Sequence, residues 1–177
     1  MKTTSILAAT LLSGSAALAK PSQDLQVRSP QGTFSARVTQ QAINGPGLQL
    51  EVTPESIHGQ SSGRPVDLTL ADGRIHGTVG QAPVDLQLRE RTETLELKGT
   101  FAGQASELRL SHEELAGNVG DCGYELTIER NRRWYEGRRT CGSGLQSPVT
   151  VVIPPELKKE TSEQLMSALA IFLSQPR

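Results

Sequence analysis

Apolar and polar residues alternate through most of the chain, and the alternation recurs in units of similar length. In one unit, Leu68 and Leu70 precede a polar turn, and an apolar residue, one further residue and a glycine follow it at 75–77. Alternation with period two around a polar turn is typical of a β-hairpin, and its repetition strengthens the prediction. The units open at leucines spaced 18, 18, 22 and 18 residues apart: Leu50, Leu68, Leu86, Leu108 and Leu126. A divergent first copy spans residues 25–36.

The turn at Asp72-Gly73 predicts the register of each unit. Asn-Gly and Asp-Gly are favoured in two-residue hairpin turns, so Leu70 is expected opposite Ile75 and Leu68 opposite Gly77. A slip of one residue would mix the apolar and polar faces. The same rule places one leucine opposite one glycine on the buried face of every other unit: Leu50 with Gly59, Leu86 with Gly99, Leu108 with Gly117, and Leu126 with Gly137.

The row of glycines predicts a curved sheet. A glycine inside a strand is costly, so a repeated one indicates a sharp bend or a close approach of another element. We therefore expect an all-β, antiparallel meander of about twelve strands in 18-residue hairpin repeats, curled into a barrel, roll or sandwich. A last strand at 149–153 is stopped by Pro154 and Pro155.

The end of the chain, 155–177, predicts one amphipathic helix. It begins either near Pro155 or at Thr161, which forms a capping box with Gln164. Its apolar residues spread over one broad face, so we expect it to pack on the concave side of the sheet, in the same domain as 20–154. A helix that docks on a partner or a membrane surface is the alternative, although its polar face is not strongly basic.

The first 19 residues predict a secretory signal peptide. Lys2 is a basic start, 6–12 is a short apolar stretch, and Ala17-Leu18-Ala19 is a small-x-small cleavage site. We therefore expect an exported protein, periplasmic or secreted, cut after Ala19. No later segment is apolar and long enough for a transmembrane helix.

Export predicts that Cys122 and Cys141 form a disulfide, because exported chains meet oxidising conditions. The register of the fifth hairpin supports it, because Leu126 opposite Gly137 also places the cysteines face to face. It further places Glu125 opposite Arg138 on the solvent side. Two free thiols are the alternative, and two thiolates without a nearby histidine make an incomplete zinc site.

Composition narrows the partners. The chain has 36% apolar, 21% charged and 3% aromatic residues, and its net charge is −1. These values describe a folded domain, give no reason to expect a nucleic-acid partner, and argue against a base-stacking surface.

The candidate binding residues lie at two hairpin tips, 89–94 and 130–134. Loops that vary on a regular scaffold often carry recognition, and arginines beside an aromatic residue suit an anionic envelope component. Ordinary solvated strand faces are the alternative, because glutamates accompany the arginines. The candidates are Arg89, Arg91, Arg130, Arg132, Arg133 and Trp134.

No catalytic motif, phosphate loop or metal-ligand spacing is found, so we expect no enzyme, no cofactor and no metal. The favoured function is an exported, non-enzymatic binding or structural protein of the cell envelope or extracellular space. One alternative is a carrier of a lipid or other apolar molecule, held between sheet and helix. The other is an exported enzyme whose site is not recognised.

Overall fold

The computed structural model describes residues 24–128 and 133–175. The expected signal peptide, 1–19, lies outside this part of the chain. The described strands and helices are β1 (Asp24–Ser29), β2 (Gly32–Val38), β3 (Ala42–Gly45), β4 (Leu48–Val52), β5 (Ser56–Ser61), β6 (Arg64–Ala71), β7 (Arg74–Val79), β8 (Ala82–Arg91), β9 (Thr94–Phe101), β10 (Gln104–Ser111), β11 (Glu114–Val119), β12 (Cys122–Ile128), β13 (Tyr135–Cys141), β14 (Gly144–Val152), the 3-10 helix η1 (Leu157–Lys159) and α1 (Ser162–Leu173).

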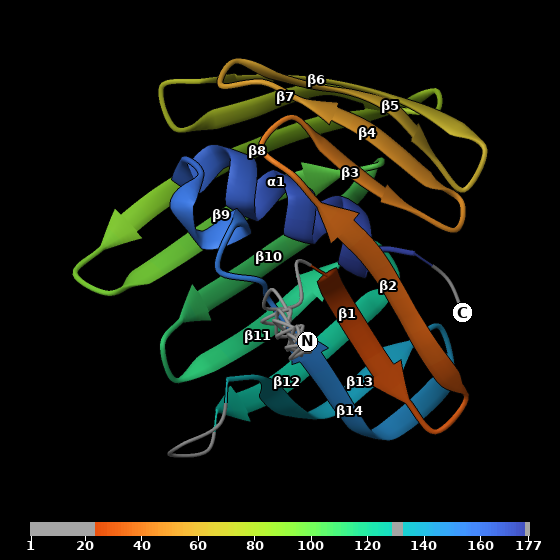
Figure 1. The fold of residues 1–177 in the computed structure, drawn as a ribbon. Helices are drawn as coiled ribbons and strands as arrows, with labels where there is room; N and C mark the ends of the chain where they lie inside the picture. Colours follow the sequence, from red (N-terminus) through yellow and green to blue (C-terminus); the bar gives the residue numbers. More distant parts are fainter. Residues whose placement is uncertain (1–23, 129–132, 176–177) are drawn as a thin grey trace, which may run out of the picture.

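The strands form a closed antiparallel barrel, which is one of the three expected forms (Figure 1). Each strand pairs with the next along the chain, and β1 pairs with β14 through Val27 opposite Val151. Closure removes the unpaired edges that an open meander would expose. The six predicted hairpins are present. The strands beyond them are β3, whose short run has one buried apolar residue, and β14, which begins at Gly144 rather than at 149.

The predicted register is confirmed in every repeat. Leu70 lies opposite Ile75, and Leu68 lies opposite Gly77. The other four leucine–glycine pairs are also as predicted: Leu50 with Gly59, Leu86 with Gly99, Leu108 with Gly117, and Leu126 with Gly137.

Close approach of two backbones explains the glycine row. Gly77 has φ +144°, and a Cβ there would collide with the carbonyl oxygen of Asp67 and lie 3.1 Å from Leu68 Cα. L-residues rarely adopt this conformation, which glycine tolerates without strain. The other four repeat glycines meet the equivalent carbonyl of their neighbouring strand. The row therefore reflects the tightly coiled strands of the barrel wall.

Helix α1 packs on the concave side of the sheet, as predicted, and because the sheet is closed the helix lies inside the barrel (Figure 1). All its residues from Gln164 to Leu173 are buried. A closed wall surrounds the helix, so its less apolar side is also removed from water. The later of the two predicted starts is confirmed: Thr161 Oγ1 accepts from Gln164 N at 3.3 Å, and Gln164 Oε1 accepts from Thr161 N at 3.0 Å. The helix thus fills the barrel.

Candidate binding site at the mouth of the barrel

The first predicted tip is mostly strand. Arg89 and Arg91 belong to β8, because the pairing of Leu88 with Leu97 continues to Arg91 opposite Thr94. Only residues 92–93 form the turn. Arg91 Nε lies 3.9 Å from Glu96 Oε2, and Arg89 donates to Gln87 Oε1 at 3.3 Å. The expected long loop is wrong, and both arginines are exposed on the outer wall.

The second predicted tip is described only in part. Arg130 and Arg132 lie outside the described residues. Arg133 is exposed, and Trp134 is 37% exposed and donates from Nε1 to Glu136 Oε2 at 3.4 Å. The β10–β11 hairpin lies between this tip and the β8–β9 tip in the barrel. The two predicted tips therefore belong to hairpins that are not neighbours in the barrel.

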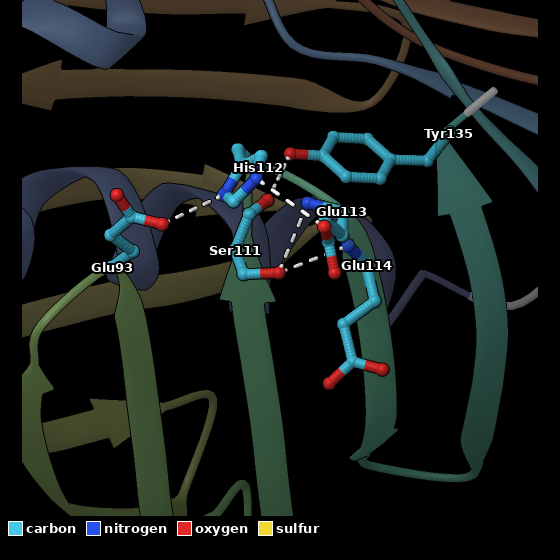
Figure 2. Close-up of polar contacts among 6 residues, drawn as sticks. All are labelled: Glu93, Ser111, His112, Glu113, Glu114 and Tyr135. Carbon is cyan, nitrogen blue, oxygen red and sulfur yellow. Dashed lines mark hydrogen bonds and ion pairs between the residues drawn. The ribbon is translucent and has the colours of Figure 1, made fainter. Parts of the chain in front are cut away.

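Figure 2 shows the turn that lies between those tips. His112 lies between two carboxylates, with Nδ1 3.3 Å from Glu93 Oε2 and Nε2 3.5 Å from Glu113 Oε1. Tyr135 donates to Ser111 O at 2.6 Å, and burial raises the pKa of the Tyr135 hydroxyl. The histidine and both glutamates are exposed. Within 24–128 and 133–175, no three His, Cys, Asp or Glu residues are placed to hold a metal ion.

The opposite end of the barrel, where α1 ends, has two hollows. We call this end the mouth, and it is bounded by the turns at 62–63, 120–121 and 142–143. One hollow, of about 500 Å³, is lined by residues that include Arg64, Asp121, Ser174 and the disulfide. The other, of about 450 Å³, is the mouth pocket: Val27, Ser29, Gln31, Gly32, Thr33, Phe34, Pro46, Ser62, Arg139 and Gln175. Its volume is within the range of small-molecule sites.

Among the described residues that line the mouth pocket, Arg139 is the only charged one, and it is 2% exposed. Its Nη2 donates to Gln175 O at 2.7 Å and to Cys122 Sγ at 3.2 Å. Its guanidinium carbon lies 5.5 Å from the centre of the Tyr124 ring. Within the described part of the chain, Nε is buried without a partner, and no carboxylate pairs with this arginine. A buried charge is costly when no opposite charge accompanies it.

A second unpaired polar atom lies close by in the wall. Gln146 of β14 is the strand partner of Arg139 and is 6% exposed. Its Nε2 donates to Gln31 Oε1, whereas its own Oε1 is buried without a donor in the described residues. The mouth therefore contains a donor and an acceptor that its own side chains leave unsatisfied, which is unusual inside a folded protein.

The mouth pocket also has apolar lining residues. Val27, Phe34 and Pro46 line it, and the Phe34 ring lies 4.8 Å from the ring of Phe172 in α1. Gln175, which follows the helix, donates to Ser61 Oγ at 3.0 Å. The end of the helix thus forms part of the pocket wall, and the pocket presents one cation beside an apolar surface.

The predicted disulfide and its neighbouring ion pair are confirmed. Cys122 lies opposite Cys141 and is bonded to it, and Glu125 lies opposite Arg138. Arg138 Nε donates to Glu125 Oε2 at 2.6 Å on the outer wall. The disulfide borders the second hollow of the mouth. The described residues contain no free cysteine.

Sequence reasoning missed Arg139 as an inner residue, although the signal was present. Arg139 is two residues from Gly137 and from Cys141, which are both predicted to face inward. The same register places Arg139 opposite Tyr124, as observed. Gln146 and Gln175 carried no such signal, because the predicted last strand began at 149 and the course of the chain after the helix was open.

A larger hollow of about 710 Å³ lies on the outer wall over β10–β13. Its charged lining includes Glu125 and Arg138, which pair with each other. We favour the mouth pocket because the charge of Arg139 is buried and has no carboxylate partner in the described residues. No helix of the described residues is long and apolar enough to cross a membrane. Comparison of the chain with protein-family models, curated proteins and solved structures found no match.

Proposed function

We propose that the protein is an exported, non-enzymatic binding protein of the cell envelope or extracellular space, and that it binds a small anion in the mouth pocket. The observation that carries the proposal is Arg139, a buried cation without a carboxylate partner in the described chain. Its contact with Gln175 O also holds the chain after the helix. A neutral donor would serve that purpose without a buried charge, so the charge itself favours an anionic ligand.

Export is supported by the disulfide, because such bonds persist in oxidising compartments. The proposed cleavage follows Ala19. N-terminal sequencing of the protein recovered from the periplasm or the medium of an expressing bacterium should therefore begin at Lys20. Recovery of the chain only from the cytoplasm, with its first residues intact, would contradict export.

A carrier of an apolar molecule is the second candidate, and the apolar side of the same pocket favours it. The space between the wall and the helix is occupied by side chains, since Met166, Leu169 and Phe172 are at most 1% exposed. A carried molecule would therefore lie at the mouth. Native mass spectrometry after mild extraction tests both candidates, because either ligand type adds mass to the intact chain.

The direct test of anion binding is a thermal-shift panel on the purified exported protein. The panel contains acetate, hexanoate, phosphate and sulfate, with hexanol and hexylamine as neutral and cationic controls. We expect at least one anion to raise Tm, because a ligand of the native state stabilises it by mass action. Arg139→Met should abolish the shift, and Arg138→Met, its exposed neighbour, should retain it. Equal shifts in both variants would contradict the proposal.

A further inference from the structure

We infer that the ligand of the mouth pocket is a monocarboxylate with a small apolar body, whose carboxylate lies on Arg139 and whose body lies against Phe34. This inference rests on the proposed function, since it specifies the ligand class of the same pocket. It joins two independent observations: an unpaired buried cation and an adjacent apolar wall.

The charge of the pocket selects a single carboxylate. Among the described lining residues Arg139 carries the only charge, so one negative charge neutralises this part of the site. Inorganic phosphate carries on average more than one negative charge at neutral pH and would bring an excess that Gln31 and Gln175 do not neutralise. A carboxylate supplies the missing negative charge, and its planar pair of oxygens suits the guanidinium group. At Nη2 the sulfur of Cys122 is a weak acceptor, which a carboxylate oxygen can replace.

The apolar wall selects what is attached to the carboxylate. Phe34 is partly exposed, and its ring is held against Phe172 of the helix, so it presents a preformed apolar surface. Val27 lies opposite Phe34 in the β1–β2 pair, and Pro46 also lines the pocket. The pocket volume of about 450 Å³ suits a body of a few carbons or one ring. Acetate, which lacks such a body, should therefore bind more weakly than hexanoate.

The first experiment needs no variant. Isothermal titration calorimetry of the exported protein compares hexanoate with hexanol and with inorganic phosphate. We expect hexanoate to bind at least about tenfold more tightly than hexanol, because a hydrogen bond to a charged group contributes that much, and more tightly than phosphate, which has no apolar body. From acetate through butanoate to hexanoate, each added methylene should strengthen binding by about fourfold while the chain is buried.

Variants then assign each half of the ligand to its residue. Arg139→Met should weaken hexanoate binding by at least about tenfold, and Arg139→Lys should weaken it less, because it keeps the charge and loses the fork. Phe34→Leu should flatten the dependence on chain length and leave acetate binding unchanged. Arg138→Met is the control on the outer wall and should bind as the unaltered protein does. Near-ultraviolet circular dichroism checks that each variant is folded.

The outcomes separate this inference from the function on which it rests. Phosphate binding as tight as hexanoate binding, and lost in Arg139→Met, would overturn the monocarboxylate and leave an anion site. Absence of binding by every probe would overturn both. Hexanol binding as tight as hexanoate binding would overturn the role of the charge. If Arg139→Met fails to fold, the comparison of hexanoate with hexanol and phosphate still decides.

Discussion

Arg138 and Arg139 are neighbours in β13, yet they belong to opposite faces of the barrel wall. Arg138 is exposed and pairs with Glu125 at 2.6 Å. Arg139 is 2% exposed and has no carboxylate partner in the described chain. Exposed ion pairs contribute little to stability, whereas a buried unpaired charge is costly. The comparison teaches that an outer charge can be substituted with little loss of stability. An inner residue is constrained by the space and the partners around it.

Other pairs of residues show the same contrast. On the outer face, Arg74 bonds Asp85 at 2.9 Å and Lys98 lies 3.3 Å from Glu107, so charges of both signs line adjacent strands. On the inner face, glycines alternate with large apolar residues around a buried helix. Substitutions at matched positions of the two faces should therefore differ sharply in their cost.

The largest expected effect is at an inner glycine. Gly77→Ala should lower the free energy of unfolding by at least about 3 kcal/mol, because the methyl group meets the backbone of β6 and φ is +144°. Gly123→Ala on the outer face should change the free energy of unfolding by less than about 1 kcal/mol. The nearest atom to the added Cβ would be 3.9 Å away, and the φ of Gly123 lies outside the range that L-residues avoid. Urea unfolding of both variants measures the difference. Equal costs would contradict the explanation of the glycine row.

The disulfide should give the next largest difference. Replacing Cys122 and Cys141 together by alanine should cost roughly 3 kcal/mol, because the bond closes a loop across 19 positions of sequence. Replacing the outer pair of the same hairpin, Glu125 and Arg138, by alanine should cost less than about 1 kcal/mol. Thermal unfolding of the two double variants compares the faces within one hairpin. A Tm unaffected by loss of the disulfide would show that other contacts hold this hairpin closed.

A smaller effect is expected at the start of the enclosed helix. Thr161→Ala removes the side chain that accepts from Gln164 N and should cost about 1 kcal/mol. Thr161→Ser keeps the accepting hydroxyl and is the control. Chemical denaturation of the three proteins tests this, and an equal loss in both variants would indicate that the methyl group of Thr161, and not its cap, matters.

The smallest effect is expected at an outer ion pair. The hydrogen bond from Arg74 lowers the pKa of Asp85 below its usual value. A carboxyl group whose pKa is lower in the folded state stabilises that state above its unfolded pKa, and this contribution is lost as the pH falls through the folded pKa. Asp85→Asn should therefore lower Tm slightly at neutral pH and not at acidic pH. A difference that grows in acid would have the wrong sign.

Local rules predicted the register well. The Asp72-Gly73 turn and the alternation place Leu68 opposite Gly77, and the same register joins Cys122 to Cys141. These features depend on neighbouring strands, whose pairing is determined by turn chemistry and period-two alternation. The capping box at Thr161 is likewise a local pattern.

Features that depend on closure were harder to predict. Whether α1 lies on an open sheet or inside a closed barrel depends on the pairing of β1 with β14, and no pattern within either strand indicates that pairing. Arg89 was placed in a loop because the apolar alternation stops at Leu88, although backbone pairing continues beyond it. The mouth pocket combines Phe34, Arg139 and Gln175 from distant parts of the chain, so only the closed barrel reveals it.

The most direct test of the central claim is a ¹H–¹⁵N spectrum of the arginine side chains during a titration with hexanoate. We predict that the Nε–H resonance of Arg139, assigned by its loss in Arg139→Lys, shifts progressively to saturation as a carboxylate binds the guanidinium group. The Nε–H of Arg138, already bonded to Glu125, should stay in place. An Arg139 resonance that does not move at saturating hexanoate would contradict the account.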